Sequence, residues 1–140
     1  MEGVTLNIII SPIIIACILG ESLHNTKLDE AYLFTSHVLL NRMNDSRWPD
    51  TLEEVVLQPL QFSCMNGPEN VRKLLNYQKY HPSIWEKART ALELASIQRK
   101  DPTLGAKWYM TKKLYYSKNR PSWTKNMTIT VIKFNHVYLK

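Results

Sequence analysis

The chain has few of the residues that build disulfide-rich or glycine-rich proteins. Its 140 residues include two cysteines, four glycines and no low-complexity tract. Two cysteines are too few for a disulfide scaffold, so we expect Cys17 and Cys64 to be reduced. A hydrophobic share of 44% and a charged share of 21% exclude a disordered or fibrous chain. The length suits one compact domain, and we expect residues 1–140 to form it.

The chain also lacks the features of an export signal and of a membrane span. Residues 7–19 (NIIISPIIIACIL) are apolar, but the residues before them contain Glu2 and no Lys or Arg. A signal peptide has a basic region in front of its apolar core. Ser11 and Pro12 interrupt the run, which is shorter than the roughly 20 residues that a transmembrane helix needs. We therefore expect a core helix here and no evident signal peptide.

Motifs for metal, nucleotide or nucleophilic chemistry are missing as well. The four histidines share no metal-ligand spacing, and no H-E-x-x-H, C-x-x-C or Gly-rich phosphate loop occurs. There is no G-x-S-x-G motif, and neither cysteine stands in a nucleophile signature. We therefore expect neither a metal ion nor a cofactor.

Positive charge is what the chain has in excess. Lys and Arg number 18 against 12 Asp and Glu, which gives a net charge of +6. Such a charge favours an anionic partner, such as nucleic acid, a lipid surface or an acidic cell-wall polymer. The basic residues are spread out, with a mild excess over residues 99–113 that a solvated basic face explains equally well. No nucleic-acid partner is therefore expected.

Hydrophobic periodicity predicts helices first and strands last. Ser11 and Pro12 form a typical helix start, with Ser as N-cap and Pro at the first helical position. Two S/T-x-x-E patterns, beginning at Thr51 and Ser83, predict further capped starts. We expect helices over residues 12–24, 28–44, 52–57, 70–77 and from 83 to before 101, a loop over 58–65, and strands over 106–110 and 128–134. This order indicates the α+β class.

Glu21 is the most informative candidate for catalysis. It follows Gly20 at the end of the apolar helix, with Ile14, Cys17 and Ile18 on its helix face. Apolar neighbours and the negative end of the helix dipole both disfavour an ionised carboxylate and so raise its expected pKa. A general acid that works near neutral pH requires such a raised pKa. Spacing alone, however, favours a solvent-facing glutamate at a frayed helix end.

Side chains suited to binding sugars form weaker signals. Gln61, Phe62 and Ser63 offer an amide, a ring and a hydroxyl, although an ordinary loop that packs its Phe into the core fits equally well. His136 is more typical of a structural histidine among strand residues. The last third is also rich in aromatic residues, which either stack on sugars or form the core of a small sheet: Trp108, Tyr109, Tyr115, Tyr116, Trp123 and Tyr138.

Eight short fragments follow one another in an order known from one enzyme family. They are Gly20-Glu21, residues 38–42 (VLLNR), 48–51 (WPDT), 58–63 (QPLQFS), 101–106 (DPTLGA), Trp108-Tyr109, 121–123 (PSW) and 136–138 (HVY). Each fragment is weak alone, but together, across most of the chain, they resemble the SleB-type cell-wall hydrolases, a family named for the spore-cortex-lytic enzyme.

The resemblance implies a fold, a reaction and a set of site residues. The fold is a lysozyme-like two-lobed α+β domain, mainly helical, with a small antiparallel sheet near the C-terminus. The reaction cleaves the β-1,4 bond between N-acetylmuramic acid and N-acetylglucosamine, as in lytic transglycosylases, with Glu21 as the catalytic acid. The residues expected to bind substrate, from the family pattern together with their chemistry, are Gln61, Phe62, Ser63, Tyr109, Trp123 and His136.

The chain departs from the family pattern at several places. A second Glu that often follows the G-E pair has no counterpart, and Glu30 matches a later family Glu as a candidate secondary acid. Trp48 stands where the family has Phe. The glycine before the late histidine is replaced by Phe134-Asn135. These changes affect the secondary acidic contacts rather than the primary acid.

The expected function is therefore the degradation of peptidoglycan glycan strands by a monomeric enzyme. The absence of a signal favours a phage endolysin, present in the host cytoplasm before release to the wall, or associated with the virion. A hydrolytic, lysozyme-type muramidase remains an alternative. So does a non-catalytic basic protein that binds the wall or nucleic acid.

Overall fold

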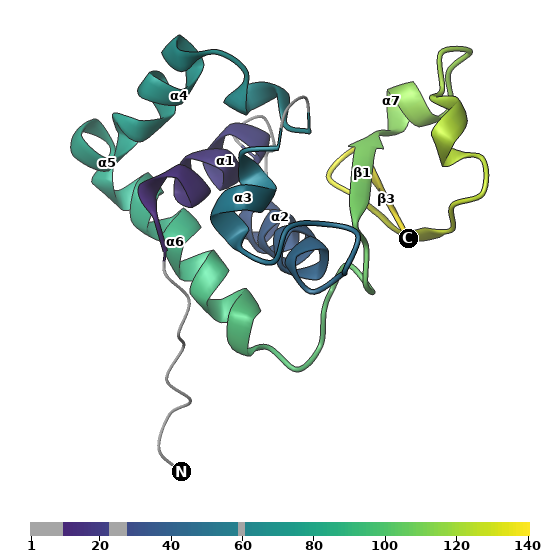
Figure 1. Cartoon of the computed structure of the whole chain (residues 1–140), viewed down its shortest axis with the longest axis horizontal. Coiled ribbons are helices and arrows are strands. Elements are labelled where there is room, and N and C mark those ends of the chain that lie inside the picture. The colour runs from purple at the N-terminus through teal and green to yellow at the C-terminus, as the bar shows by residue number, and fades with distance from the viewer. Residues whose placement is uncertain (1–9, 23–27, 59–60) are drawn as a thin grey trace.

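A helical body and a small sheet make up the structure, a computed structural model that describes residues 10–22, 28–58 and 61–140 (Figure 1). The body contains α1 (Pro12–Ser22), α2 (Leu28–Met43), α3 (Leu52–Val56), the 3-10 turn η1 (Ser63–Met65), α4 (Pro68–Leu75), α5 (Tyr77–Tyr80) and α6 (Pro82–Ile97). The sheet region contains β1 (Trp108–Thr111), α7 (Lys112–Tyr115), the 3-10 turn η2 (Ser122–Thr124), β2 (Ile129–Lys133) and β3 (His136–Leu139). The expected α+β class, with helices first and a C-terminal antiparallel sheet, is confirmed.

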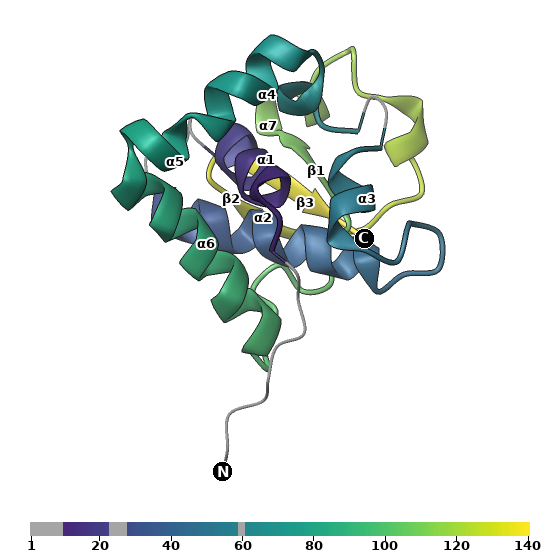
Figure 2. The same ribbon diagram turned by 60° about the vertical axis from the view of Figure 1, so that its left-hand side comes forward.

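Helix α1 forms the centre of the helical body. Its residues from Ile14 to Leu19 are all buried, because α1 packs against α2, α3, α4 and α6 (Figure 2). A helix that is enclosed on all sides is apolar all round rather than amphipathic, which explains the uninterrupted run IIIACIL. The expectation of a core helix is confirmed. Within the described part of the chain, no helix is long and apolar enough to cross a membrane.

One predicted helix cap is confirmed and another is wrong. The hydroxyl oxygen of Thr51 accepts a hydrogen bond from the backbone N–H of Glu54, 3.2 Å away, at the start of α3. Ser83 does not cap α6, which begins one residue earlier at Pro82 with no side-chain cap. Proline has no N–H to satisfy and a fixed φ, so it starts this helix without a capping hydroxyl.

Other boundaries shift by a few residues. Where a helix was expected over 70–77, α4 begins at Pro68 and α5 follows as a separate turn. The expected loop over 58–65 contains the 3-10 turn η1, in which the N–H of Asn66 bonds the Ser63 carbonyl; its positions 59 and 60 lie outside the described residues. The last two positions of the helix expected over 12–24 also lie outside them.

The three strands pair antiparallel in the order β1-β3-β2. In this register Tyr109 lies opposite Tyr138, and Thr111 lies opposite His136. Phe134 and Asn135 form the two-residue turn between β2 and β3, with φ of 56° and 59°. Positive φ at both positions is typical of a type I′ hairpin turn. The Phe134 ring packs edge-on against Phe34 of α2, with centroids 5.0 Å apart, which ties the turn to the helical body.

The end of α2 holds the segment that leads from α6 into β1. The side-chain amide of Asn41 donates to Asp101 Oδ2 at 2.7 Å and to the Ala106 carbonyl at 2.9 Å. Arg42 Nε donates to the Lys107 carbonyl at 2.6 Å. Asp101 also accepts the N–H groups of Thr103 and Gly105. Two of the sequence fragments, VLLNR and DPTLGA, therefore act together to place β1 beside α2.

Candidate functional site

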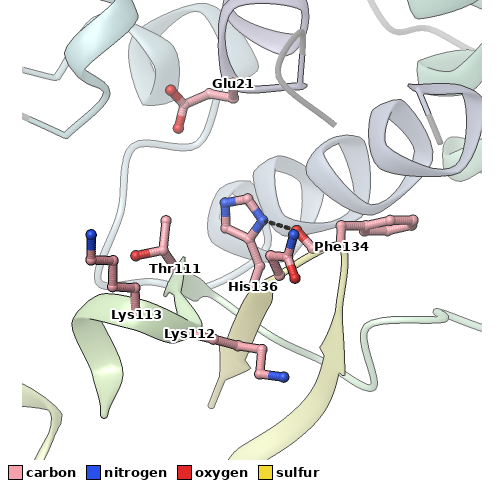
Figure 3. Close-up of a pocket in the computed structure, with 7 residues that line it drawn as sticks. Glu21, Thr111, Lys112, Lys113, Phe134 and His136 are labelled. Carbon is pink, nitrogen blue, oxygen red and sulfur yellow. Dashed lines mark hydrogen bonds between the residues drawn. The ribbon is translucent and has the colours of Figure 1, made fainter. Parts of the chain in front are cut away.

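A pocket of about 520 Å³ lies between the end of α1 and one end of the sheet (Figure 3). Glu21 forms its helical side. The opposite side comes from the end of β1, the start of α7 and the β2–β3 turn. The residues that line it there are Thr111, Lys112, Lys113, Phe134, Asn135 and His136. Among the described lining residues, Glu21 is the one carboxylate.

Glu21 owes its position to the close packing of the last turn of α1. A Cβ atom added to Gly20 would lie 2.5 Å from Cys64 Cβ and 2.9 Å from Leu74 Cδ1. Both distances are shorter than real contacts, so only glycine lets η1 and α4 approach the helix this closely. The group that approaches Gly20 most closely is the side chain of Cys64. Cys64 and Cys17 are both free thiols, and the Cys64 thiol faces the Cys17 carbonyl at 3.8 Å.

Tyr109 connects the sheet to Glu21. Its hydroxyl donates a hydrogen bond to Glu21 Oε1 across 88 positions of sequence. Burial raises the pKa of the Tyr109 phenol well above its ordinary value, and the negative charge of Glu21 and this hydrogen bond raise it further. The phenol therefore stays protonated and donates to the carboxyl group, which leaves Glu21 Oε2 as the oxygen that can carry or release a proton.

His136 stands in the pocket beside Tyr109. The two ring centroids are 5.7 Å apart in an edge-on arrangement. His136 Nδ1 lies 2.9 Å from the Phe134 carbonyl (Figure 3). A carbonyl oxygen only accepts, so Nδ1 carries the hydrogen. In the neutral ring Nε2 is then free to accept a hydrogen bond from a ligand hydroxyl.

The structure thus brings together three of the predicted site residues, Glu21, Tyr109 and His136. Trp123 lies outside the pocket wall, on η2, with 53% of its surface exposed. Its ring is therefore open to solvent, and its stacking role stays a prediction.

The predicted sugar-binding loop lies elsewhere. Phe62 is only 2% exposed and packs into the main core, with the Arg42 guanidinium 4.9 Å from its ring centroid. The Gln61 side-chain oxygen accepts from Arg42 Nη1 at 3.4 Å, and Ser63 is exposed at the start of η1. None of the three lines the pocket formed by the described residues. The structure therefore fits the interpretation in which this loop packs its Phe into the core. In this position the buried ring of Phe62 cannot stack on a sugar.

The candidate secondary acid also lies outside the pocket wall. Glu30, in the first turn of α2, accepts from Lys133 Nζ at 2.6 Å. Asp29 beside it is exposed and lies 3.7 Å from Lys87 Nζ.

Five lining residues were not predicted from the sequence as site residues: Thr111, Lys112, Lys113, Phe134 and Asn135. The two lysines entered the sequence analysis only as part of a mild basic excess, and Phe134-Asn135 only as a missing glycine. The pairing of Thr111 with His136 brings both segments to the pocket. That pairing depends on strand register, which no local motif indicates.

Comparison with known proteins identifies the family to which this small α+β protein belongs. The family described as Cell Wall Hydrolase matches residues 29–139, so the chain belongs to that family. The expectation of an enzyme that degrades the cell wall is confirmed. Glu21 lies in front of the matched segment, so its role depends on the geometry above and on the G-E fragment.

Two solved structures have the same fold over the whole chain. One is the catalytic domain of the germination-specific lytic transglycosylase SleB from Bacillus anthracis, with a TM-score of 0.63 and 21% identity, covering 100% of this chain and 99% of that one. The other is the catalytic domain of the Bacillus cereus SleB protein, with a TM-score of 0.65, 21% identity and 100% coverage of both chains. The SleB-type resemblance is confirmed. A search of curated proteins found no match.

Proposed function

We propose that the protein is a lytic transglycosylase that cleaves the β-1,4 bond between N-acetylmuramic acid and N-acetylglucosamine in peptidoglycan, with Glu21 as its acid and base. The observation that carries the proposal is the pocket in which Glu21, held by Tyr109, is the one carboxylate among the described lining residues. One structural neighbour is a lytic transglycosylase, which supports the reaction class.

A single carboxyl group is enough for this reaction. In the first step, protonated Glu21 donates its proton to the glycosidic oxygen while the bond from the muramoyl C1 to that oxygen breaks. N-acetylglucosamine then leaves with a free 4-hydroxyl, and C1 passes through an oxocarbenium-like state. In the second step, the Glu21 carboxylate removes the proton of the muramoyl 6-hydroxyl, and O6 bonds to C1. No water is consumed, and Glu21 ends protonated again.

Tyr109 prepares Glu21 for both steps. Because the phenol bonds Oε1, the reacting proton is placed on Oε2, the other carboxyl oxygen. The same bond stabilises the carboxylate that forms after the first proton transfer. The 6-hydroxyl belongs to the substrate itself, so it is held near C1 at a high effective concentration and needs no second base to bring in water.

The composition of the products tests the proposal directly. Digested peptidoglycan analysed by mass spectrometry should carry 1,6-anhydromuramoyl ends, one water lighter than hydrolysed ends. Glu21→Gln keeps the shape of the side chain but cannot donate the proton, so we expect clearing activity to fall by about 10²–10⁴-fold with an unchanged melting temperature. Reducing ends as the main product would instead indicate a hydrolytic muramidase. Full activity of folded Glu21→Gln would refute the role of Glu21.

We propose that the biological role is lysis of a bacterial host by a phage. The enzyme would act as an endolysin that is present in the host cytoplasm before its release to the wall, or that is associated with the virion. The net charge of +6 supports retention on the anionic wall after release. Expression inside a bacterium tests this role. We expect no lysis from the enzyme alone and rapid lysis when a membrane-permeabilising protein is co-expressed. Lysis without the second protein would contradict it.

A further inference from the structure

Two lysines line the pocket across from Glu21, and the proposed proton transfers use neither. Lys112 and Lys113 are the first two residues of α7, and both are exposed. Figure 3 shows Glu21 on one side of the pocket and both lysine side chains on the other, with their amino groups directed apart. The wall of the pocket opposite Glu21 therefore carries two positive charges, which a bound anion can meet when the lysine side chains turn towards it.

These charges are available to a ligand. Among the described residues, neither Lys112 nor Lys113 lies within salt-bridge distance of a carboxylate, whereas Lys87, Lys107 and Lys133 each do. The remaining lining residues besides Glu21 carry polar or aromatic side chains: Thr111, Phe134, Asn135 and His136.

The backbone that carries the two lysines is held firmly. The N–H of Lys112 donates to the Asn135 carbonyl at 2.8 Å, which joins the start of α7 to the β2–β3 turn. The Thr111 hydroxyl accepts the N–H of Leu114 at 3.1 Å and caps the helix. Tyr115, at the end of α7, is buried, and the central carbon of the Arg120 guanidinium lies 3.9 Å from the centroid of its ring. The backbone positions of both lysines at the pocket wall are therefore fixed, while their exposed side chains can turn towards a bound anion.

The substrate of the proposed reaction carries an anion close to the bond that breaks. Each N-acetylmuramic acid bears a lactyl group whose carboxyl is either free or amide-linked to a stem peptide, and the stem peptide has carboxylates of its own. We infer that Lys112 and Lys113 form a subsite that binds a carboxylate of the muramoyl substituent while Glu21 acts on the adjoining glycosidic bond. This inference depends on the proposed function, and it makes anionic glycan strands the preferred substrate class.

A comparison of charged and neutralised substrate tests the subsite. Soluble glycan strands would be prepared with intact stem peptides, and separately with the peptides removed by an amidase so that the lactyl carboxylate is free. Half of each preparation would be amidated with carbodiimide and ammonia, which removes the negative charges. The kcat/KM of the full chain would be measured on all four substrates, for the wild type and for the double variant Lys112→Gln/Lys113→Gln. The matched control Lys79→Gln/Lys100→Gln loses the same charge from exposed sites on α5 and after α6.

We expect the wild type and the control to lose about five- to tenfold in kcat/KM on amidated strands, as two solvent-accessible ion pairs allow. The preference should fade as salt rises towards about 1 M, where screening is nearly complete. The Lys112/Lys113 double variant should cleave charged and amidated strands equally. If the wild type prefers charged over amidated strands after amidase treatment, the lactyl carboxylate is the group that the two lysines bind. If it shows this preference on strands with intact stem peptides, they bind a carboxylate of the stem peptide.

Two negative outcomes are distinguishable. If the wild type cleaves charged and amidated strands at equal rates, or if the double variant keeps the full preference, the subsite is refuted while the transglycosylase proposal stands. If the wild type cleaves none of the four substrates, the proposed function fails, and the subsite fails with it.

Discussion

Replacing Gly20 by alanine tests whether the close packing in front of Glu21 determines the stability of the site. In an open helix this change is favourable by up to about 1 kcal/mol, because alanine restricts the unfolded chain more than glycine does. At Gly20, however, the new methyl group would lie 2.5 Å from Cys64 Cβ, 2.6 Å from Cys64 Sγ and 2.9 Å from Leu74 Cδ1. Overpacking of this kind typically costs about 1–3 kcal/mol.

We therefore expect Gly20→Ala to lower the free energy of unfolding by about 1–2 kcal/mol, after the helix gain is subtracted. For a domain of this size the melting temperature should fall by roughly 3–8 °C. Clearing activity should fall as well, since Glu21 follows Gly20 directly and a small displacement of a catalytic group is costly.

The second-site variants identify the cause. Cys64→Gly removes both the Cβ and the Sγ, so most of the cost of Gly20→Ala should disappear in that background. Cys64→Ala keeps the Cβ at 2.5 Å and should leave most of it in place. Urea denaturation of the single and double variants gives the coupling energy. The reasoning is refuted if Gly20→Ala is as stable as the wild type, or if Cys64→Ala relieves it as well as Cys64→Gly does.

Three further predictions concern the carboxylates and their partners. Tyr109→Phe removes the hydrogen bond to Glu21, so kcat should fall about 10–100-fold, which corresponds to the loss of a hydrogen bond to a charged group. KM and the melting temperature should change little. A rise in KM by the same factor would instead indicate that Tyr109 binds the substrate. Burial alone would raise the pKa of Asp101, but the hydrogen bonds to its carboxylate outweigh burial and lower the pKa. The ionised carboxylate therefore stabilises the fold near neutral pH, and this stabilisation is lost as acid protonates it. Urea titrations should show Asp101→Asn about 1–3 kcal/mol less stable than the wild type at pH 7, with a smaller difference at pH 3. Asp29→Asn and Glu30→Gln should both keep substantial clearing activity, because both acids pair with lysines outside the pocket; loss of activity in either, together with reducing ends, would indicate a lysozyme-type mechanism.

Much of the helical body could be predicted because its signals are local. The apolar run of α1 and the Thr51 cap depend on neighbours within a few positions, and the structure has both as expected. The failure at Ser83 is also local, since a capping hydroxyl and a proline at adjacent positions compete to start one helix. Pro82 starts it because its fixed φ suits the first helical position and its missing N–H needs no partner, which places Ser83 inside the helix rather than at its cap.

The site was harder to predict because it depends on contacts between distant positions. Glu21 could be selected from its G-E fragment and its apolar face, but its partner Tyr109 is 88 positions away and comes to it through the pairing of β1 with β3. Phe62 shows the opposite case. An amide, a ring and a hydroxyl in sequence suit a sugar, yet local order does not indicate that the ring lies in the core under Arg42.

The family fragments themselves divide into two kinds, which explains why they could indicate the family but not the full lining of its pocket. Asn41, Arg42 and Asp101 belong to fragments as distinctive as the G-E pair, but they bond one another and the backbone in order to hold β1 beside α2. Glu21 and His136 face the pocket. A fragment is distinctive whenever its side chains make specific contacts, whether with substrate or with the rest of the fold. Only the geometry separates the two kinds, and it places Lys112 and Lys113, which belong to no fragment, in the wall of the pocket that Glu21 faces.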